Sequence, residues 1–123
     1  MQKSEKGIDV KGPQILIIAP TRELAIQSKD VIDRLQNSKD EFKLSCLYGG
    51  KNMFEQKRQL YQNPNIVIGT PGRIKAMIES DLFKVENLST LILDEADVLL
   101  DFGFDKDILA INDLIKSKST KDL

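Results

Sequence analysis

The sequence predicts an α/β fold with a mostly parallel sheet flanked by helices. Short apolar runs alternate with amphipathic segments along the chain, which is the pattern of successive strand-helix-strand units. The clearest run is Leu91–Leu93, which is followed at once by the carboxylates Asp94, Glu95 and Asp97. Continuous apolar runs are typical of central parallel strands that helices cover on both faces. Because ligands bind beyond the carboxyl ends of such strands, these acids are candidate site residues.

Composition limits the class of protein. The chain has 123 residues, enough for one domain, and 18 basic and 19 acidic side chains give a net charge of −1. Any contact with nucleic acid must therefore be local. No run approaches the roughly 20 apolar residues of a membrane span, so we expect an intracellular, soluble protein with no membrane partner. Cys46, the single cysteine, excludes an intrachain disulfide and is expected in the core, and no histidine is present.

The first predicted strand is the apolar run Ile15–Ala19, which Pro20 and Thr21 close. A helix follows, with one apolar side formed by Leu24, Val31, Ile32 and Leu35. Thr21 is a good N-cap candidate, and Glu23 adds negative charge to the first turn, where the helix dipole favours it.

The second predicted strand, Phe42–Tyr48, ends at Gly49-Gly50. A polar helix is expected from about Met53 to Tyr61, and Asn63-Pro64-Asn65 ends it. The β-branched run Ile66–Ile68 then predicts the third strand.

The remaining elements repeat this order. Thr70 is expected to cap a helix that has Pro71 at its first position and Ile74, Met77 and Ile78 in its buried stripe. The fourth strand, Leu91–Leu93, precedes the acids and the apolar stretch Val98–Leu100. A last helix is predicted over Phe104–Ile115, with Ile108, Ile111, Leu114 and Ile115 buried.

Two interpretations of the acids remain open. In the first, Asp94 holds a magnesium ion through its waters while Glu95 orients an attacking water, which is the division of labour that phosphoryl transfer needs. In the second, the acids form a solvated turn that caps the next helix.

Three other strand ends place a hydroxyl, a glycine or an arginine where a helix begins or a turn tightens: Pro20-Thr21-Arg22-Glu23-Leu24-Ala25, Gly49-Gly50 and Thr70-Pro71-Gly72-Arg73. Such groups bind a sugar-phosphate backbone without reading bases. Ordinary capping and turn chemistry is the alternative for each. Arginine in a first helical turn opposes the helix dipole, which favours a partner anion for Arg22 and Arg73.

Together with Asp94-Glu95-Ala96-Asp97, in this order and spacing, these motifs resemble the DEAD-box RNA helicases. The resemblance extends from about Gln14 to Ile115 and includes the Leu100–Phe104 continuation. That family couples ATP binding and hydrolysis to remodelling of RNA and RNA-protein complexes, and it uses two RecA-like domains.

The resemblance implies a role for each motif residue. Asp94 would hold the Mg²⁺ of ATP through water, Glu95 would position the hydrolytic water, and Asp97 would link the nucleotide site to the motif on the next strand. The RNA path would be lined by Pro20, Thr21, Arg22, Gly49, Gly50, Thr70, Pro71, Gly72 and Arg73. The implied partners are single-stranded or duplex RNA, bound independently of sequence, and a second RecA-like domain of the same protein.

The sequence also departs from the family. It contains no Gly-x-x-x-x-Gly-Lys-Ser/Thr phosphate loop and no Ser-Ala-Thr motif. The resemblance therefore implies a partial RecA-like (P-loop NTPase) domain over residues 14–116, with a flexible lead at 1–13 and a tail at 117–123 that stops before the next strand. We expect the isolated chain to be inactive as an ATPase.

The family's strand order predicts the neighbours in the sheet: Leu91–Leu93, Ile15–Ala19, Ile66–Ile68, then Phe42–Tyr48. The absent strands lie beyond the acidic one, so the edge at Leu91–Leu93 would be open and would invite self-association.

Two alternatives to a helicase remain. One is a non-catalytic RNA-binding or partner-binding module of helicase origin. The other is an unrelated nucleotide-binding α/β domain, which would explain the acids but not Pro20–Ala25 together with Thr70–Arg73. Nucleus and cytoplasm are equally compatible with the sequence.

Overall fold

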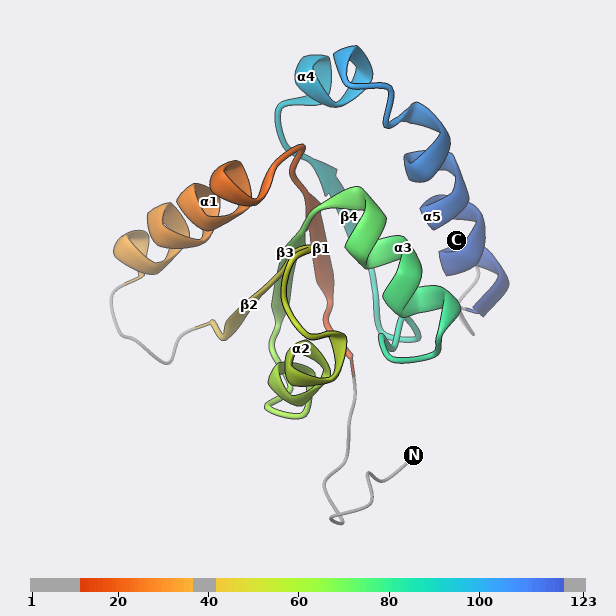
Figure 1. The fold of residues 1–123 in the computed structure, drawn as a ribbon. Helices are drawn as coiled ribbons and strands as arrows, with labels where there is room; N and C mark the ends of the chain where they lie inside the picture. Colours follow the sequence, from red (N-terminus) through yellow and green to blue (C-terminus); the bar gives the residue numbers. More distant parts are fainter. Residues whose placement is uncertain (1–11, 37–41, 119–123) are drawn as a thin grey trace.

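A four-stranded parallel sheet forms the centre of the molecule (Figure 1). The computed structural model describes residues 12–36 and 42–118, so most of the expected N-terminal lead and C-terminal tail lies outside the described residues. The strands are β1 (Ile15–Ile18), β2 (Leu44–Leu47), β3 (Ile66–Gly69) and β4 (Thr90–Leu93). Their order is β2-β3-β1-β4, which confirms the expected α/β class and the expected neighbours.

Helices cover both faces of the sheet (Figure 1). On one face lies α1 (Arg22–Leu35), and the other face packs against α2 (Met53–Leu60), α3 (Pro71–Glu79) and α5 (Asp105–Lys118). A short helix, α4 (Ala96–Asp101), begins just after the acids that follow β4. The sequence indicated only an apolar stretch there. Its single buried side chain is Leu99.

Side chains of β1 alternate between two cores, as the pleat of a strand requires. Leu16 and Ile18 belong to the larger cluster, which includes the predicted stripe of α3 (Ile74, Met77, Ile78) and Ile111 and Ile115 of α5. Ile17 and Ala19 point to the other face, where they pack with Ala25 of α1. The alternation fixes β1 between the two helical layers.

Gly69 allows α3 to approach the sheet closely. A Cβ atom built there would lie 2.5 Å from Cδ1 of Ile74 and 2.7 Å from the carbonyl oxygen of Leu47. Both distances are too short for any side chain, and the carbonyl belongs to the neighbouring strand. Glycine at this position therefore sets how near the start of α3, and with it Arg73, lies to β2.

The fourth strand differs from one expectation. The apolar run before the acids was expected to be a buried central strand, but β4 is an edge strand of the described sheet, and Ile92 and Leu93 are 43% and 40% exposed. That expectation is wrong for the described residues, because nothing among them pairs with the outer side of β4. The open edge that the family's strand order implied is confirmed.

The apolar side of α1 is only partly buried. Leu24 and Ile32 pack against the sheet, whereas Val31 and Leu35 are 52% and 76% exposed. Val31 faces the uncovered side of the sheet next to β4. The helical period in the sequence was correct, but no described element covers that side.

Cys46 is half-buried at the edge of the α1-side core. Burial raises the pKa of its thiol to about 11. The side chain is thus protonated at neutral pH, as expected for a structural cysteine. Among the described residues, no helix has both the length and the apolar character to cross a membrane.

Candidate functional site

The predicted site residues lie at one edge of the sheet. All four strands are parallel, so their carboxyl ends meet along that edge, where α1 and α3 begin (Figure 1). Pro20–Arg22 follow β1, Gly49-Gly50 follow β2, Thr70–Arg73 follow β3, and Asp94 and Glu95 follow β4. The fold therefore collects motifs that are far apart in the sequence.

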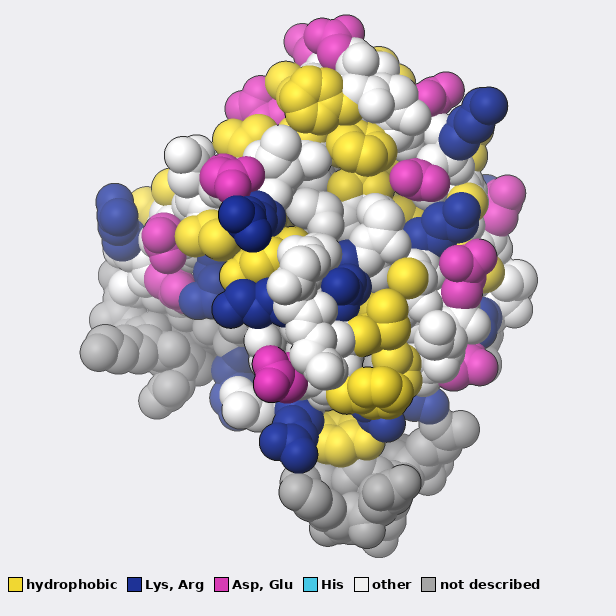
Figure 2. Space-filling model, in the orientation of Figure 1, with side chains coloured by type: hydrophobic (Ala, Val, Ile, Leu, Met, Phe, Trp, Pro, Cys, Tyr) yellow, Lys and Arg dark blue, Asp and Glu magenta, His cyan; other side chains and the backbone are white. Residues whose placement is uncertain are grey.

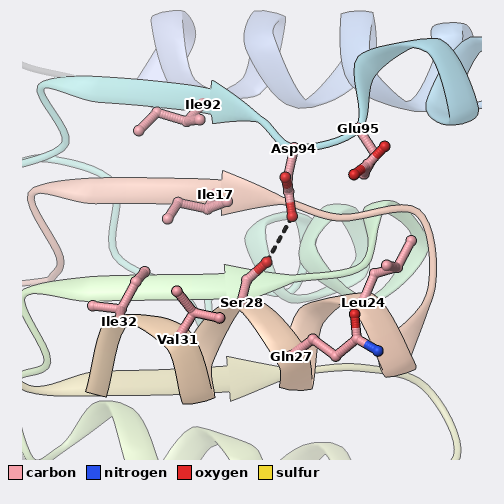
Figure 3. A pocket seen from close by; sticks show the side chains of 9 residues that line it. All are labelled: Ile17, Leu24, Gln27, Ser28, Val31, Ile32, Ile92, Asp94 and Glu95. Atoms are coloured by element: carbon pink, nitrogen blue, oxygen red, sulfur yellow. Dashed lines mark hydrogen bonds between the residues drawn. The ribbon is translucent and has the colours of Figure 1, made fainter. Parts of the chain in front are cut away.

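The acids border an open cleft between α1 and β4 with a volume of about 330 Å³. Asp94 and Glu95 lie at one end of it, and Leu24, Gln27, Ser28 and Val31 of α1 lie across from them (Figure 3). The hydroxyl of Ser28 donates a hydrogen bond of 2.7 Å to Oδ2 of Asp94. This bond joins α1 directly to the acid after β4.

Ser28 was not among the predicted site residues. A signal for it exists in the sequence, because it follows Leu24 by four residues and so lies on the same, sheet-facing side of α1. That position alone does not reveal its partner. The partner depends on β4 lying beside β1, which is a property of the fold.

Glu95 has an unusual backbone conformation. Its φ and ψ angles of 53° and 55° are left-handed, and its side chain makes no capping bond to α4 although it occupies the N-cap position. The capping interpretation of the acids is therefore wrong for Glu95. Its carboxylate instead borders the cleft (Figure 3). Asp97 is exposed in the first turn of α4, where the helix dipole favours negative charge.

The acid pair fits a magnesium ion only in a limited way. Within residues 12–36 and 42–118, no three acidic, cysteine or histidine side chains are grouped so that they alone hold a metal. Mg²⁺ bound with a nucleotide needs fewer protein ligands, because phosphate oxygens and waters complete its shell. Ser28 engages Oδ2 of Asp94, which leaves Oδ1 available to a water of such an ion. The donor set thus fits Mg²⁺ held through water by one carboxylate.

At the end of β1, the predicted cap is present. Oγ1 of Thr21 accepts a hydrogen bond of 3.1 Å from the amide of Leu24. Pro20 is buried, whereas Arg22 is exposed and its Nε lies 3.0 Å from Oε2 of Glu23. The hydrogen bond from Arg22 lowers the pKa of the Glu23 carboxyl. In this structure Arg22 therefore forms an ion pair with its neighbour Glu23. Both side chains are exposed, and breaking such a pair costs little free energy.

The turn after β2 lies beside Arg22. Gly50 has a φ of 87°, a conformation that favours glycine, and a Cβ built there would lie 3.8 Å from Nη1 of Arg22. A Cβ at Gly49 would meet nothing within 4 Å. The two glycines thus leave backbone accessible next to a guanidinium group.

At the end of β3, the expected capping bond is absent. Thr70 occupies the N-cap position of α3, but its hydroxyl makes no capping bond, and Pro71 is the first helical residue as predicted. Thr70 thus has the predicted N-cap position, but the side-chain bond expected of a cap is absent. The first-turn amides of α3 are left for another acceptor, and amides in this position bind anions. Gly72 is exposed beside them.

Arg73 is half-buried, and Gln56 of α2 holds it. Nη1 of Arg73 lies 3.5 Å from Oε1 of Gln56, whose Nε2 donates a 3.0 Å hydrogen bond to the carbonyl oxygen of Tyr48. Tyr48 precedes Gly49-Gly50. Gln56 is a second residue that sequence reasoning missed, since a glutamine in a polar helix is ordinarily exposed.

Basic side chains gather on this side of the molecule. Figure 2 shows Lys and Arg side chains grouped in the middle of the face, between the regions of α1 and α3 in Figure 1. The chain as a whole carries a net charge of −1, so this grouping is local. It is the arrangement that a local contact with a polyanion requires.

Comparisons with known proteins agree with this geometry. Residues 3–122 match the family described as DEAD/DEAH box helicase. The chain is 41% identical over 108 residues to the ATP-dependent RNA helicase CshA of Limosilactobacillus reuteri, covering 86% of this chain and 22% of that protein. It is 44% identical over 119 residues to the ATP-dependent RNA helicase DBP3 of Mycosarcoma maydis, covering 95% of this chain and 20% of that protein. The chain spans about a fifth of the length of these curated relatives.

The fold is also shared with a solved structure. A DEAD box protein from the hyperthermophile Methanococcus jannaschii superposes with a TM-score of 0.79 at 43% sequence identity, covering 85% of this chain and 28% of that one. The four-stranded sheet is accordingly a partial RecA-like domain of the DEAD-box type. With a family match over nearly its whole length, the chain belongs to the DEAD/DEAH box helicase family.

Proposed function

We propose that this chain supplies the acidic part of an ATP site and part of an RNA-backbone groove to an ATP-dependent RNA helicase. The observation that carries the proposal is the carboxyl edge of the sheet. There, an acid pair beside a cleft and the three turns that follow β1, β2 and β3 lie along one edge. In open α/β sheets this edge is where ligands bind.

On the nucleotide side, Asp94 and Glu95 have different roles. Bound with ATP, Mg²⁺ would neutralise charge on the phosphates, and Asp94 would hold that ion through water. Glu95 would orient the attacking water, since its carboxylate makes no capping bond and borders the cleft. Asp97 would connect this site to the motif that follows in the complete protein.

On the RNA side, the turns would grip the sugar-phosphate backbone. The uncapped amides of α3, the glycine turn after β2, and the guanidinium groups of Arg22 and Arg73 are donors without base selectivity. The hydroxyls of Thr21 and Thr70, with Pro20 and Pro71 shaping their turns, would complete the path. Binding of this kind is indifferent to sequence, and the ribose 2′-hydroxyl would distinguish RNA from DNA.

The test is ATP turnover with and without single-stranded RNA. It is run on the 123-residue chain and on the form extended to the ends of its encoded domains. We expect turnover only in the extended form, and we expect RNA to accelerate it. If the extended form binds RNA but never hydrolyses ATP, the proposal is wrong, and the chain belongs to a non-catalytic RNA-binding module.

A further inference from the structure

Gln56 is almost completely buried in a helix that is otherwise mostly exposed. It is 1% exposed, and with Ser45 it makes up the buried polar side chains of the described residues. Leu60 is the only other buried residue of α2. Burying an amide is unfavourable unless its donor and acceptor are both satisfied. A glutamine in this position therefore calls for an explanation in terms of its partners.

The partners determine the orientation of the amide. Nε2 donates to the carbonyl oxygen of Tyr48 at 3.0 Å, and Oε1 accepts from Nη1 of Arg73 at 3.5 Å. A carbonyl oxygen only accepts and a guanidinium group only donates, so turning the amide over would lose both bonds. Glutamate lacks the donor, and an apolar residue lacks both groups. The site is specific for a neutral amide of this length.

Gln56 thereby connects two strand ends. Tyr48 leads into Gly49-Gly50 after β2, and Arg73 lies in the first turn of α3 after β3. A neutral acceptor orients the guanidinium group without cancelling its charge, whereas a carboxylate would neutralise it. An arginine already held in place loses less conformational freedom when it binds an anion.

We propose that Gln56 is a positioning residue for RNA-backbone binding. It holds the guanidinium group of Arg73 and the Gly49-Gly50 turn as one preformed unit that meets consecutive parts of the sugar-phosphate backbone. This inference rests on the proposed function, in which Arg73 contacts RNA, and adds the residue that places it.

The test is a double-mutant cycle on RNA affinity. It uses the complete protein, a short mixed-sequence single-stranded RNA and a non-hydrolysable ATP analogue. Gln56→Met keeps the approximate volume and removes both hydrogen bonds, and we expect it to weaken RNA binding roughly threefold to tenfold. Arg73→Ala should weaken binding equally across sequences and reduce the salt slope by about 1. In the Arg73→Ala background, Gln56→Met should have little further effect, because residues that act as a unit are not additive.

A control and a second variant keep the test decisive. Gln59→Met changes an exposed glutamine of the same helix and should leave RNA affinity unchanged. If Gln56→Met does not fold, Gln56→Asn takes its place in the cycle, since it keeps a buried amide that is too short to reach both partners.

The outcomes separate the inference from the function on which it rests. If Arg73→Ala leaves RNA affinity unchanged, the proposed RNA contact itself is wrong. If Arg73→Ala weakens binding but the Gln56 variant has no effect, or if the two effects simply add, Gln56 has only a packing role. In that case the RNA contact survives and the positioning role is overturned.

Discussion

Glu95 has a backbone conformation that costs a non-glycine residue of the order of 1 to 3 kcal/mol. Its φ of 53° ends β4 abruptly and starts α4, and the side chain does not recover that cost through a capping bond. This conformation and the position of the carboxylate beside the cleft support the proposed role of Glu95 in the ATP site. Asp94, held by Ser28, is the complementary, fixed acid of the pair.

We therefore expect Glu95→Gln to lower ATP turnover by roughly 10²- to 10⁴-fold in the complete protein, the usual contribution of a positioned proton-transfer group. Glutamine keeps the size of the side chain but cannot accept a proton. Nucleotide binding should largely survive, because Asp94 and its bond to Ser28 are untouched. Steady-state turnover and equilibrium binding of ATP, measured on the same preparation, check both parts. Undiminished turnover would remove Glu95 from the mechanism.

At the scale of the elements, the two threonine caps separate what the sequence determines from what it does not. Thr21 and Thr70 each follow a strand, have extended backbone angles and precede a helix, so both were predicted as caps. Only Thr21 bonds to its helix. Which way a hydroxyl turns depends on a side-chain rotamer that local sequence does not fix.

This difference gives a direct comparison of stability. Thr21→Ala removes an observed cap bond and should lower the free energy of unfolding by about 1 kcal/mol. Thr70→Ala removes no such bond and should change it by less than about 0.5 kcal/mol. The free energies of unfolding in urea of the two variants and the parent, all of the same chain length, check the prediction. Equal losses would mean that Thr70 caps α3 in solution.

The larger elements were predictable, and the reasons are physical. Apolar runs and helical periods predict every strand and four of the five helices within residues 12–36 and 42–118, because burial of apolar side chains imposes those periods. The helix α4 was missed, since its start depends on the left-handed conformation of Glu95. The links Ser28 to Asp94 and Gln56 to Arg73 join residues 66 and 17 positions apart and follow only from the packed fold.

At the scale of the whole molecule, the described sheet has two edge strands, β2 and β4, and the side chains of β4 are the more exposed. Amides of Thr90 and Asp94 bond inward to Gln14 and Ile18. Successive amides of a strand point to opposite sides, so those of Leu91 and Leu93 face outward. An apolar strand with free outward amides is a template for pairing with another chain.

The 123-residue chain by itself should therefore associate through β4. Leu93→Lys places a charge on that edge, where Leu93 is 40% exposed, and should shift the chain toward monomer in light scattering. The matched control is Leu109→Lys. Leu109 is 63% exposed and lies in the helix α5, not in a strand. This change removes a comparable exposed apolar group and adds the same charge, so it should leave the apparent mass of the parent unchanged.

If the parent chain is a monomer with a cooperative melt, the open edge does not drive association. If both lysine variants dissociate it equally, the contact is a general apolar one and not pairing along β4.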